Sequence, residues 1–178
     1  MMSPSPTLLA PEAATPEAAT IAAPAHDCAL CPRLVAYRTQ NQAANPAWFN
    51  APVPSFGPAD ARLLVVGMAP GVKGANRTGR PFTGDHAGML LYQTLLRFGM
   101  AEGTYLAEPD DGLTLHDTRI TNAVRCVPPA NLPEPREVSN CNRFLIGELL
   151  GLANLRAVLA LGVLAHAAAL KACGIPPS

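Results

Sequence analysis

The sequence lacks an excess of charge of either sign, and it lacks a long uninterrupted hydrophobic run. Lys and Arg together number 13, as do Asp and Glu, so the formal net charge is zero. This balance excludes a basic polypeptide that coats nucleic acid, and any nucleic-acid contact must come from local patches. The longest charge-free apolar stretch, Ala157 to Leu170, has 14 residues and is interrupted by Gly162 and His166. A membrane-spanning helix needs roughly 20 residues, so we expect no membrane protein.

The first 25 residues also lack Lys and Arg, although they contain eight alanines and five prolines. The absence of cations excludes the positively charged start of a secretory signal and the Arg-rich helix of a transit peptide. A Pro/Ala segment buries too little apolar surface to offset the entropy of ordering it. We therefore expect residues 1–25 to form a disordered tail. One domain follows over residues 26–178, because a chain of 178 residues suffices for a single core.

Short aliphatic runs alternate with amphipathic segments along this domain. Each run is typical of a buried parallel strand: 63–66, 120–124 and 157–161. Two apolar stripes at helical spacing lie between them: Leu91, Leu95 and Phe98 before Gly99, and Val138, Cys141, Leu145 and Leu149. A further short helix is expected within 28–42. This alternation predicts an α/β fold with three α/β/α layers and a mostly parallel sheet, whose ligand lies beyond the carboxyl ends of the strands.

The segment after the first expected strand, Gly67 to Asp85, has five glycines and three cations but only one acid. Loops of this length in a compact domain are usually functional. This one contains neither a Walker motif nor a dinucleotide fingerprint. A glycine-rich backbone with cations instead suits close approach to a phosphate chain or to an anionic leaving group. A positive face, unless its members are simply solvated, would combine these cations with those near the other strand ends: Lys73, Arg77, Arg80, Arg119, Arg125 and Arg136.

The five cysteines are an odd number, and no export signal accompanies them. Metal or redox chemistry in the cytoplasm is therefore favoured over a disulfide framework. Cys28 and Cys31 are two residues apart in a Cys-x2-Cys pattern, and Cys126 and Cys141 are separated by 14 residues. Four thiolates suffice for zinc or for an iron–sulfur cluster, and the spacing leaves that choice open. The alternative is that Cys126 and Cys141 are small buried hydrophobes, as we expect for Cys173.

Three further residues have both a functional and an ordinary structural interpretation. Asn122 lies within an expected strand, where a buried amide needs partners, and it is suited either to read a pyrimidine edge or to end the strand. Phe82, placed by the rigid step at Pro81, either stacks on the same base or packs in the core. Asp85 either orients water and stabilises a cationic transition state, or caps the helix that starts near His86.

Several ordered motifs together resemble the family 5, or type B, uracil-DNA glycosylases. These motifs are Gly67-Met68-Ala69-Pro70-Gly71, the run from Asn76 to Asp85, Thr121-Asn122-Ala123-Val124-Arg125-Cys126 and the four spaced cysteines. The resemblance covers most of the chain, from about Cys28 onward. Their combination is more specific than any single motif, and it implies a uracil-DNA glycosylase-like fold.

Carried onto this sequence, the resemblance implies a structural 4Fe-4S cluster bound by Cys28, Cys31, Cys126 and Cys141. It also implies that the backbone of Gly67, Met68 and Ala69 contacts a flipped base, that Phe82 stacks on this base and that Asn122 reads its edge. Met68 stands where related families place a polar residue that helps to activate water. Asp85 is therefore the remaining candidate for positioning water or stabilising the transition state. Lys73, Arg77 and Arg80 are the expected DNA contacts.

The implied reaction is hydrolysis of the N-glycosidic bond of uracil in DNA after base flipping, a step of base-excision repair. Single- or double-stranded DNA is the expected partner of a monomeric enzyme, and deaminated purines are further expected substrates. No redox step of the metal is required. One competing interpretation is a noncatalytic iron–sulfur module that binds damaged or single-stranded DNA. Another is a zinc-stabilised α/β domain that acts on a nucleotide or another small phosphorylated ligand.

Members of this family also have a third motif, a His-x-Ser loop after a further strand. The sequence ends at Ser178 without such a motif, and His166 lies in a different context, within an Ala/Leu-rich stretch. We therefore expect this chain, without the final strand and the third motif, to be weakly active or inactive. Its natural continuation would restore activity.

Overall fold

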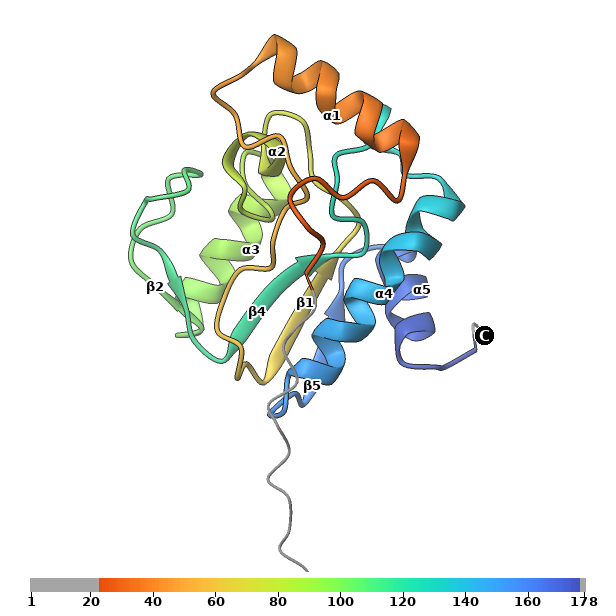
Figure 1. The fold of residues 1–178 in the computed structure, drawn as a ribbon. Helices are drawn as coiled ribbons and strands as arrows, with labels where there is room; N and C mark the ends of the chain where they lie inside the picture. Colours follow the sequence, from red (N-terminus) through yellow and green to blue (C-terminus); the bar gives the residue numbers. More distant parts are fainter. Residues whose placement is uncertain (1–22, 177–178) are drawn as a thin grey trace, which may run out of the picture.

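A computed structural model describes residues 23–176, so most of the predicted tail, residues 1–22, lies outside the described residues. Figure 1 shows the order of the elements. They are α1 (Pro32–Ala44), β1 (Leu63–Gly67), α2 (Ala75–Thr78), α3 (His86–Arg97), β2 (Ala101–Glu102), β3 (Thr114–Leu115), β4 (Thr118–Asn122), a 3-10 turn (Pro129–Asn131), α4 (Pro135–Gly151), β5 (Ala157–Ala160) and α5 (Val163–Ala172).

The central sheet has the strand order β4-β1-β5, and both of its pairings are parallel. Its middle strand β1 is the aliphatic run predicted from the sequence, and Leu64, Val65 and Val66 are fully buried. A parallel strand covered on both faces needs such a continuous apolar run. In the β1–β4 register, Gly67 is the partner of Asn122, so the carboxyl ends of the two strands lie side by side. The predicted α/β class and central parallel sheet are confirmed.

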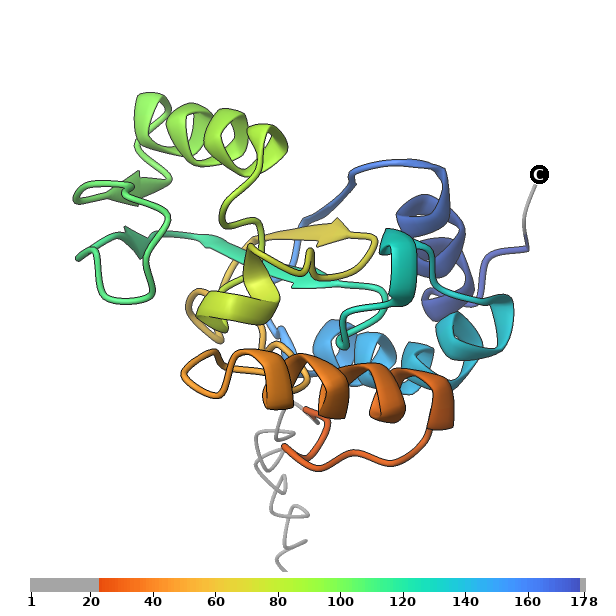
Figure 2. The ribbon, with the colours of Figure 1, turned by 90° about the horizontal axis from the view of Figure 1, so that it is seen from above.

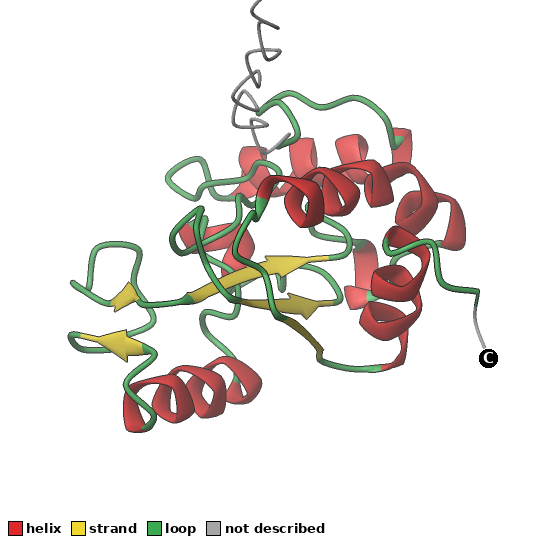
Figure 3. Ribbon diagram, turned by 90° about the horizontal axis from the view of Figure 1, so that it is seen from below, coloured by secondary structure: helices red, strands yellow, loops and turns green. Residues whose placement is uncertain are grey.

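Helices cover both faces of this sheet (Figures 2 and 3). Successive residues of a strand point to opposite faces. Accordingly, Leu64 and Val66 pack with Leu145 of α4 and with α5, whereas Val65 packs with Tyr92 of α3. The small antiparallel β2–β3 ribbon extends the α3 side of the molecule. No helix within residues 23–176 combines the length and the apolar character needed to cross a membrane.

Local sequence signals explain where the helices begin and end. Pro32 occupies the first turn of α1, so this helix starts later than the predicted residue 28. The Asp85 side chain accepts a hydrogen bond of 2.7 Å from the Gly88 N–H at the start of α3. That helix ends before Gly99, which has a φ of 69°, as the sequence predicts. A capping box between Glu134 and Glu137 opens α4.

Three expectations about packing and strand limits are wrong. The strand predicted over 120–124 spans 118–122. The Ala123 N–H still donates to the Gly67 carbonyl, but the next N–H, of Val124, donates to the Met68 carbonyl, so the chain leaves the regular parallel ladder there. Phe98 follows α3 and is 71% exposed, so it does not complete that helix's buried stripe. Cys173 at the end of α5 is exposed and does not pack in the core.

Candidate active site and cysteine cavity

A cavity of about 220 Å³ opens beyond the carboxyl ends of β1 and β4, where a ligand is expected in a parallel α/β sheet. Most of its lining comes from the glycine-rich segment after β1, together with the last residue of β4. The lining residues are Met68, Ala69, Pro70, Gly71, Ala75, Phe82, Thr83, Asp85, Ala87, Asn122 and Leu161.

Asn122 is the buried polar residue of this cavity that lacks a full set of partners. Its side chain is only 3% exposed, and its Nδ2 has no hydrogen-bond partner among the residues that the structure describes. Leaving a buried donor unpaired is costly, so such an atom usually has a functional reason. An amide presents both a donor and an acceptor, which suits a ligand with a complementary polar edge.

Gly67 permits Asn122 and Phe82 to approach each other at the end of β1. A Cβ atom at this position would lie 2.5 Å from Asn122 Oδ1 and 2.5 Å from Phe82 Cζ. Both distances are far below van der Waals contact, so even alanine would displace a side chain of the cavity. Gly67 therefore has the role of bringing an aromatic ring and an amide together against the strand backbone.

Phe82 packs on the core, as one of its two interpretations predicts, and it also lines the cavity. Its φ is 56°, a conformation that is uncommon for a bulky side chain. Gly88 of α3 lies against the Phe82 carbonyl, and a Cβ atom there would overlap this oxygen. The first turn of α3 is thus fitted closely to the backbone that presents the aromatic ring.

Asp85 caps α3, as one of its two interpretations predicts, and it also lines the cavity. The residue is exposed, and its Oδ1 is the atom that accepts from Gly88. The arrangement is therefore compatible with a carboxylate that caps the helix and acts on the bound molecule.

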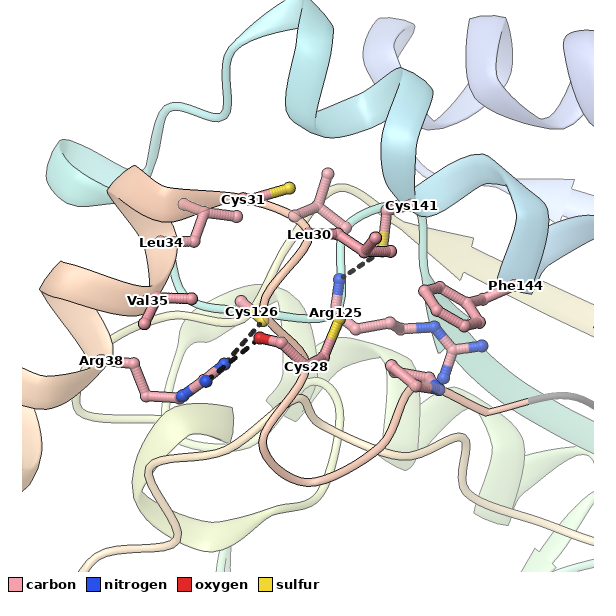
Figure 4. Close-up of a pocket in the computed structure, with 12 residues that line it drawn as sticks. Cys28, Leu30, Cys31, Leu34, Val35, Arg38, Arg125, Cys126, Cys141 and Phe144 are labelled. Atoms are coloured by element: carbon pink, nitrogen blue, oxygen red, sulfur yellow. Dashed lines mark hydrogen bonds between the residues drawn. The ribbon is translucent and has the colours of Figure 1, made fainter.

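The four cysteines Cys28, Cys31, Cys126 and Cys141 line a second, small cavity of about 20 Å³. Figure 4 shows that they come from the segment before α1, from the loop after β4 and from α4. Leu34 and Val35 of α1, with Val124 and Phe144, supply the apolar part of the lining. In the arrangement that the described residues adopt, no three His, Cys, Asp or Glu side chains are grouped closely enough to hold a metal ion.

N–H donors point at three of the four cysteine sulfurs. Arg38 Nη1 lies 3.5 Å from Cys126 Sγ, the Arg125 N–H lies 3.3 Å from Cys141 Sγ, and Asn140 Nδ2 lies 3.7 Å from Cys31 Sγ. Such donors favour sulfur that carries negative charge. Burial has the opposite effect on the free thiols, raising the pKa of Cys126 to about 12 and that of Cys141 to about 11. A set of thiolates here therefore needs a positive partner, and a metal centre provides one.

The comparisons with known proteins agree with this geometry. A sequence profile of the uracil DNA glycosylase superfamily matches residues 54–176, which include β1, β4 and the whole first cavity. The chain belongs to the uracil-DNA glycosylase superfamily. The cavity built by Gly67, Phe82 and Asn122 is thus a feature of a uracil-DNA glycosylase-like domain.

Several curated relatives carry the name Type-5 uracil-DNA glycosylase. The chain is 43% identical to the protein from Pyrobaculum aerophilum over 152 residues, which cover 83% of this chain and 67% of the relative. It is 43% identical to that from Thermus thermophilus over 157 residues, 85% of this chain and 71% of the relative. It is 41% identical to that from Mycobacterium bovis over 154 residues, which cover 83% of this chain and 58% of the relative. The chain thus spans between 58% and 71% of the length of these relatives.

Within this uracil-DNA glycosylase-like domain, the predicted positive face is only partly present. Lys73 is exposed beside the cavity, whereas Arg77 forms an ion pair of 2.8 Å with Glu108. Arg80 is 4% exposed and pairs with Asp111, which corrects the prediction that it contacts DNA. Arg119 and Arg125 both pair with the buried Glu148, at 2.8 and 3.1 Å, and do not contribute to the surface either.

Sequence reasoning missed the partners of these buried arginines. Asp111 lies 31 residues after Arg80, and Glu148 lies 23 residues after Arg125, so no local spacing connects either pair. A weak signal was available for Glu148, because an acid on the apolar stripe of a helix is costly without a cation. No comparable signal marks Asp111, which lies in a loop.

Proposed function

We propose that this chain is a uracil-DNA glycosylase, which hydrolyses the N-glycosidic bond between uracil and deoxyribose in DNA. Membership of the superfamily and the shared name of the Type-5 relatives support this activity. The observation that carries it is the unpartnered Asn122 Nδ2 in a cavity that Phe82 also lines. A flipped uracil would place its polar edge on the amide and its face on the aromatic ring.

The residues of the cavity supply distinct parts of the reaction in this proposal. Asn122 reads the uracil edge and holds the base as negative charge develops on it. The backbone around Met68 and Ala69 lines the same cavity, and peptide N–H groups there stabilise the departing anion. Met68 has no group that transfers a proton. The Asp85 carboxylate is therefore the group proposed to position water or to stabilise the cationic sugar.

Single-turnover release of uracil from single- and double-stranded oligonucleotides, with protein in excess, tests this function. Asn122→Ala is expected to lower the rate of release at least about 100-fold, because both polar contacts to the base are lost. Asn142→Ala is the matched control. Its amide is equally buried, but it donates to the Ala168 carbonyl at 2.9 Å and lies outside the cavity lining.

Two results would contradict the proposal. Equal loss of release in the Asn122 and Asn142 variants would mean that the effect reflects folding and not base recognition. Salt-dependent DNA binding without any base release, both by the parent protein and by a version that carries the natural continuation, would instead support the noncatalytic DNA-binding module. Hypoxanthine- and xanthine-containing oligonucleotides in the same assay test the proposed wider range toward deaminated purines.

We further propose that Cys28, Cys31, Cys126 and Cys141 hold a 4Fe-4S cluster with a structural role. The shared cavity and the N–H donors to three of the sulfurs support this set of ligands, and the family resemblance favours iron–sulfur over zinc. When bound, the cluster would cross-link the segment before α1 to α4 without taking part in hydrolysis. The protein's own contacts already join these parts, since Asn140 Nδ2 of α4 donates to the Leu30 carbonyl at 3.1 Å.

Analysis of iron, acid-labile sulfide and zinc in protein purified without air tests the cofactor. About four irons and four sulfides per chain are expected for a 4Fe-4S cluster. Cys126→Ser is expected to lose the iron, whereas Cys173→Ser, at an exposed cysteine outside the cavity, is expected to retain it. Zinc without sulfide in the parent protein would overturn the assignment.

A further inference from the structure

The backbone that presents Phe82 is held by side chains from another part of the chain. Tyr105 Oη donates to the Phe82 carbonyl at 3.1 Å, and Tyr92 Oη donates to the adjacent Pro81 carbonyl at 2.7 Å. We propose that Tyr105 is a positioning residue, which locks Phe82 in its strained conformation so that the ring is ready to stack on a flipped base. This inference rests on the proposed function for the identity of the stacked group.

The strain at Phe82 shows why such a lock is needed. A phenylalanine with a φ of 56° persists only when neighbouring contacts outweigh its preference for other conformations. Without them, the backbone would relax and the ring would leave the cavity wall. A hydrogen bond to the carbonyl of the strained residue itself opposes this relaxation directly.

The Tyr105 hydroxyl is itself held by a rigid arrangement. Asp111 forms two hydrogen bonds of 2.7 Å with Arg80 and accepts two more from the N–H groups of Leu106 and Leu113, at 2.8 and 3.1 Å. The carboxylate thus fixes the backbone next to Tyr105 and the residue two before Phe82 at the same time. Phe82 and Tyr105 are therefore tied to a common anchor.

An aromatic cluster reinforces this anchor. The Tyr105 ring stacks on Tyr92 with centroids 4.6 Å apart. The Arg80 guanidinium carbon lies 5.3 to 5.5 Å from the ring centroids of Tyr92, Tyr105 and Phe56. These are cation–π distances, and both Arg80 and Asp111 are shielded from solvent. Tyr105 therefore keeps its ring position even without its hydroxyl.

The two tyrosine hydroxyls differ in exposure, which makes Tyr105 the informative one. Tyr92 is fully buried, so its removal leaves the Pro81 carbonyl without a partner inside the core. Tyr105 is half-buried and also borders an open groove beside Gly84 and Asp85. Water can replace the Tyr105 hydroxyl, so Tyr105→Phe is expected to fold normally while the lock on Phe82 is weakened.

A double-mutant cycle between Tyr105→Phe and Phe82→Ala tests the inference. In single-turnover release of uracil, Tyr105→Phe is expected to lower the rate about fivefold in the parent background, as expected for one neutral hydrogen bond. In the Phe82→Ala background it is expected to have no further effect, because there is no ring left to position. Tyr37→Phe in α1 is the matched control, since Tyr37 Oη forms no hydrogen bond with a described residue. Equal losses in both backgrounds would overturn the proposal, because a purely structural role acts regardless of residue 82.

A second measurement does not depend on catalysis. Chymotrypsin cleaves after exposed aromatic residues, and the Phe82–Thr83 bond is expected to be cut several-fold faster in native Tyr105→Phe than in the parent at equal Tm. Cleavage at the same rate in both proteins would contradict the lock. If neither the parent nor a version that carries the natural continuation releases uracil, the proposed function fails, while the cleavage rates still decide whether Tyr105 holds Phe82.

Discussion

At the scale of single residues, Asp85 combines a structural contact with a place in the active-site cavity. Its Oδ1 accepts from the Gly88 N–H at 2.7 Å, as an N-cap residue does. Serine caps a helix about as well as aspartate but carries no charge. The two roles of this residue are therefore separable by substitution.

We predict that Asp85→Ser retains the parent Tm but loses at least about 100-fold in the single-turnover rate of uracil release. Asp85→Ala is expected to lose the same activity and, in addition, about 1 kcal/mol of stability with the cap. Thermal unfolding and base release are measured on the same preparations. Full activity in Asp85→Ser would show that the residue only caps α3.

Gly67→Ala is predicted to damage the base site directly, because the added methyl would lie 2.5 Å from both Asn122 Oδ1 and Phe82 Cζ. Overpacking of this kind costs about 1–3 kcal/mol, so Tm is expected to fall by several degrees together with uracil release. Gly71→Ala is the control for stability, since nothing lies within 4 Å of a Cβ atom at that position. If Gly67→Ala keeps the parent's Tm and its rate of uracil release, the space at residue 67 is not as tight as these distances indicate.

Sequence reasoning found the residues whose position along the chain is by itself energetically unfavourable. Asn122 was a candidate because an amide in a strand needs a reason, and its Nδ2 is indeed without a partner among the described residues. Arg80 was assigned to DNA because it shares a glycine-rich loop with Lys73 and Arg77, a segment that contains three cations and only one acid. Its partner Asp111 lies 31 residues away, and only the tertiary fold brings the two together.

At the scale of elements, the central sheet could be predicted from local sequence signals, whereas the segment between α3 and β4 could not. The strands and long helices follow from apolar runs and caps, which are local. The two-residue strands β2 and β3 are too short to leave a periodic signal, and the loop between them is organised around the Asp111 carboxylate. This segment was missed although it holds Tyr105 and the anchor for Arg80.

The Arg80–Asp111 pair makes a pH-dependent contribution to stability. The hydrogen bonds from Arg80 hold the pKa of Asp111 below its usual range in the folded protein. An aspartate in the unfolded chain has a pKa of about 3.9, so the unfolded chain takes up the proton first as the pH falls. The contribution is therefore complete above about pH 4 and declines at lower pH.

Asp111→Asn is predicted to lower the free energy of unfolding at pH 7 by about 3–5 kcal/mol, because Arg80 is left buried without a counter-charge. Its stability is also expected to fall less steeply than that of the parent between pH 4 and about pH 2. Urea unfolding across this range measures both effects. Glu108→Gln, at the exposed pair with Arg77, is the control and is expected to change little. If the stability of Asp111→Asn falls with pH as steeply as that of the parent, the pKa of Asp111 is not lowered in the folded protein.

At the scale of the whole molecule, the functional features gather at the carboxyl ends of β1 and β4. Three features depend on the loops that leave these two strands: the cavity lined by Asn122, the hydrogen bond from Tyr105 to Phe82, and the cysteine cavity. Arg125 joins the cysteine cavity to the buried part of α4, since its N–H faces Cys141 and its guanidinium pairs with Glu148. Loss of the proposed cluster is therefore expected to loosen β4 as well as α1.

Charge at this scale determines how DNA is bound, because most arginines near the cavity are already paired within the protein. With zero net charge and Lys73 exposed beside the cavity, binding should depend only moderately on salt. Each phosphate neutralised contributes about −0.9 to the slope of log Kobs against log salt for duplex DNA. Lys73→Ala is thus predicted to make the slope shallower by about 0.9.

Equilibrium binding of duplex DNA between about 50 and 200 mM salt measures this slope. Lys171→Ala is the matched control, because Lys171 Nζ lies 2.9 Å from Ser139 Oγ in α4 and lies outside the cavity lining. If Lys73 acts on phosphate alone, its removal weakens binding equally for uracil- and thymine-containing DNA, and the single-turnover rate at saturation stays unchanged. An unchanged slope would place the DNA backbone on another face, whereas a loss confined to uracil-containing DNA would place Lys73 at the base itself.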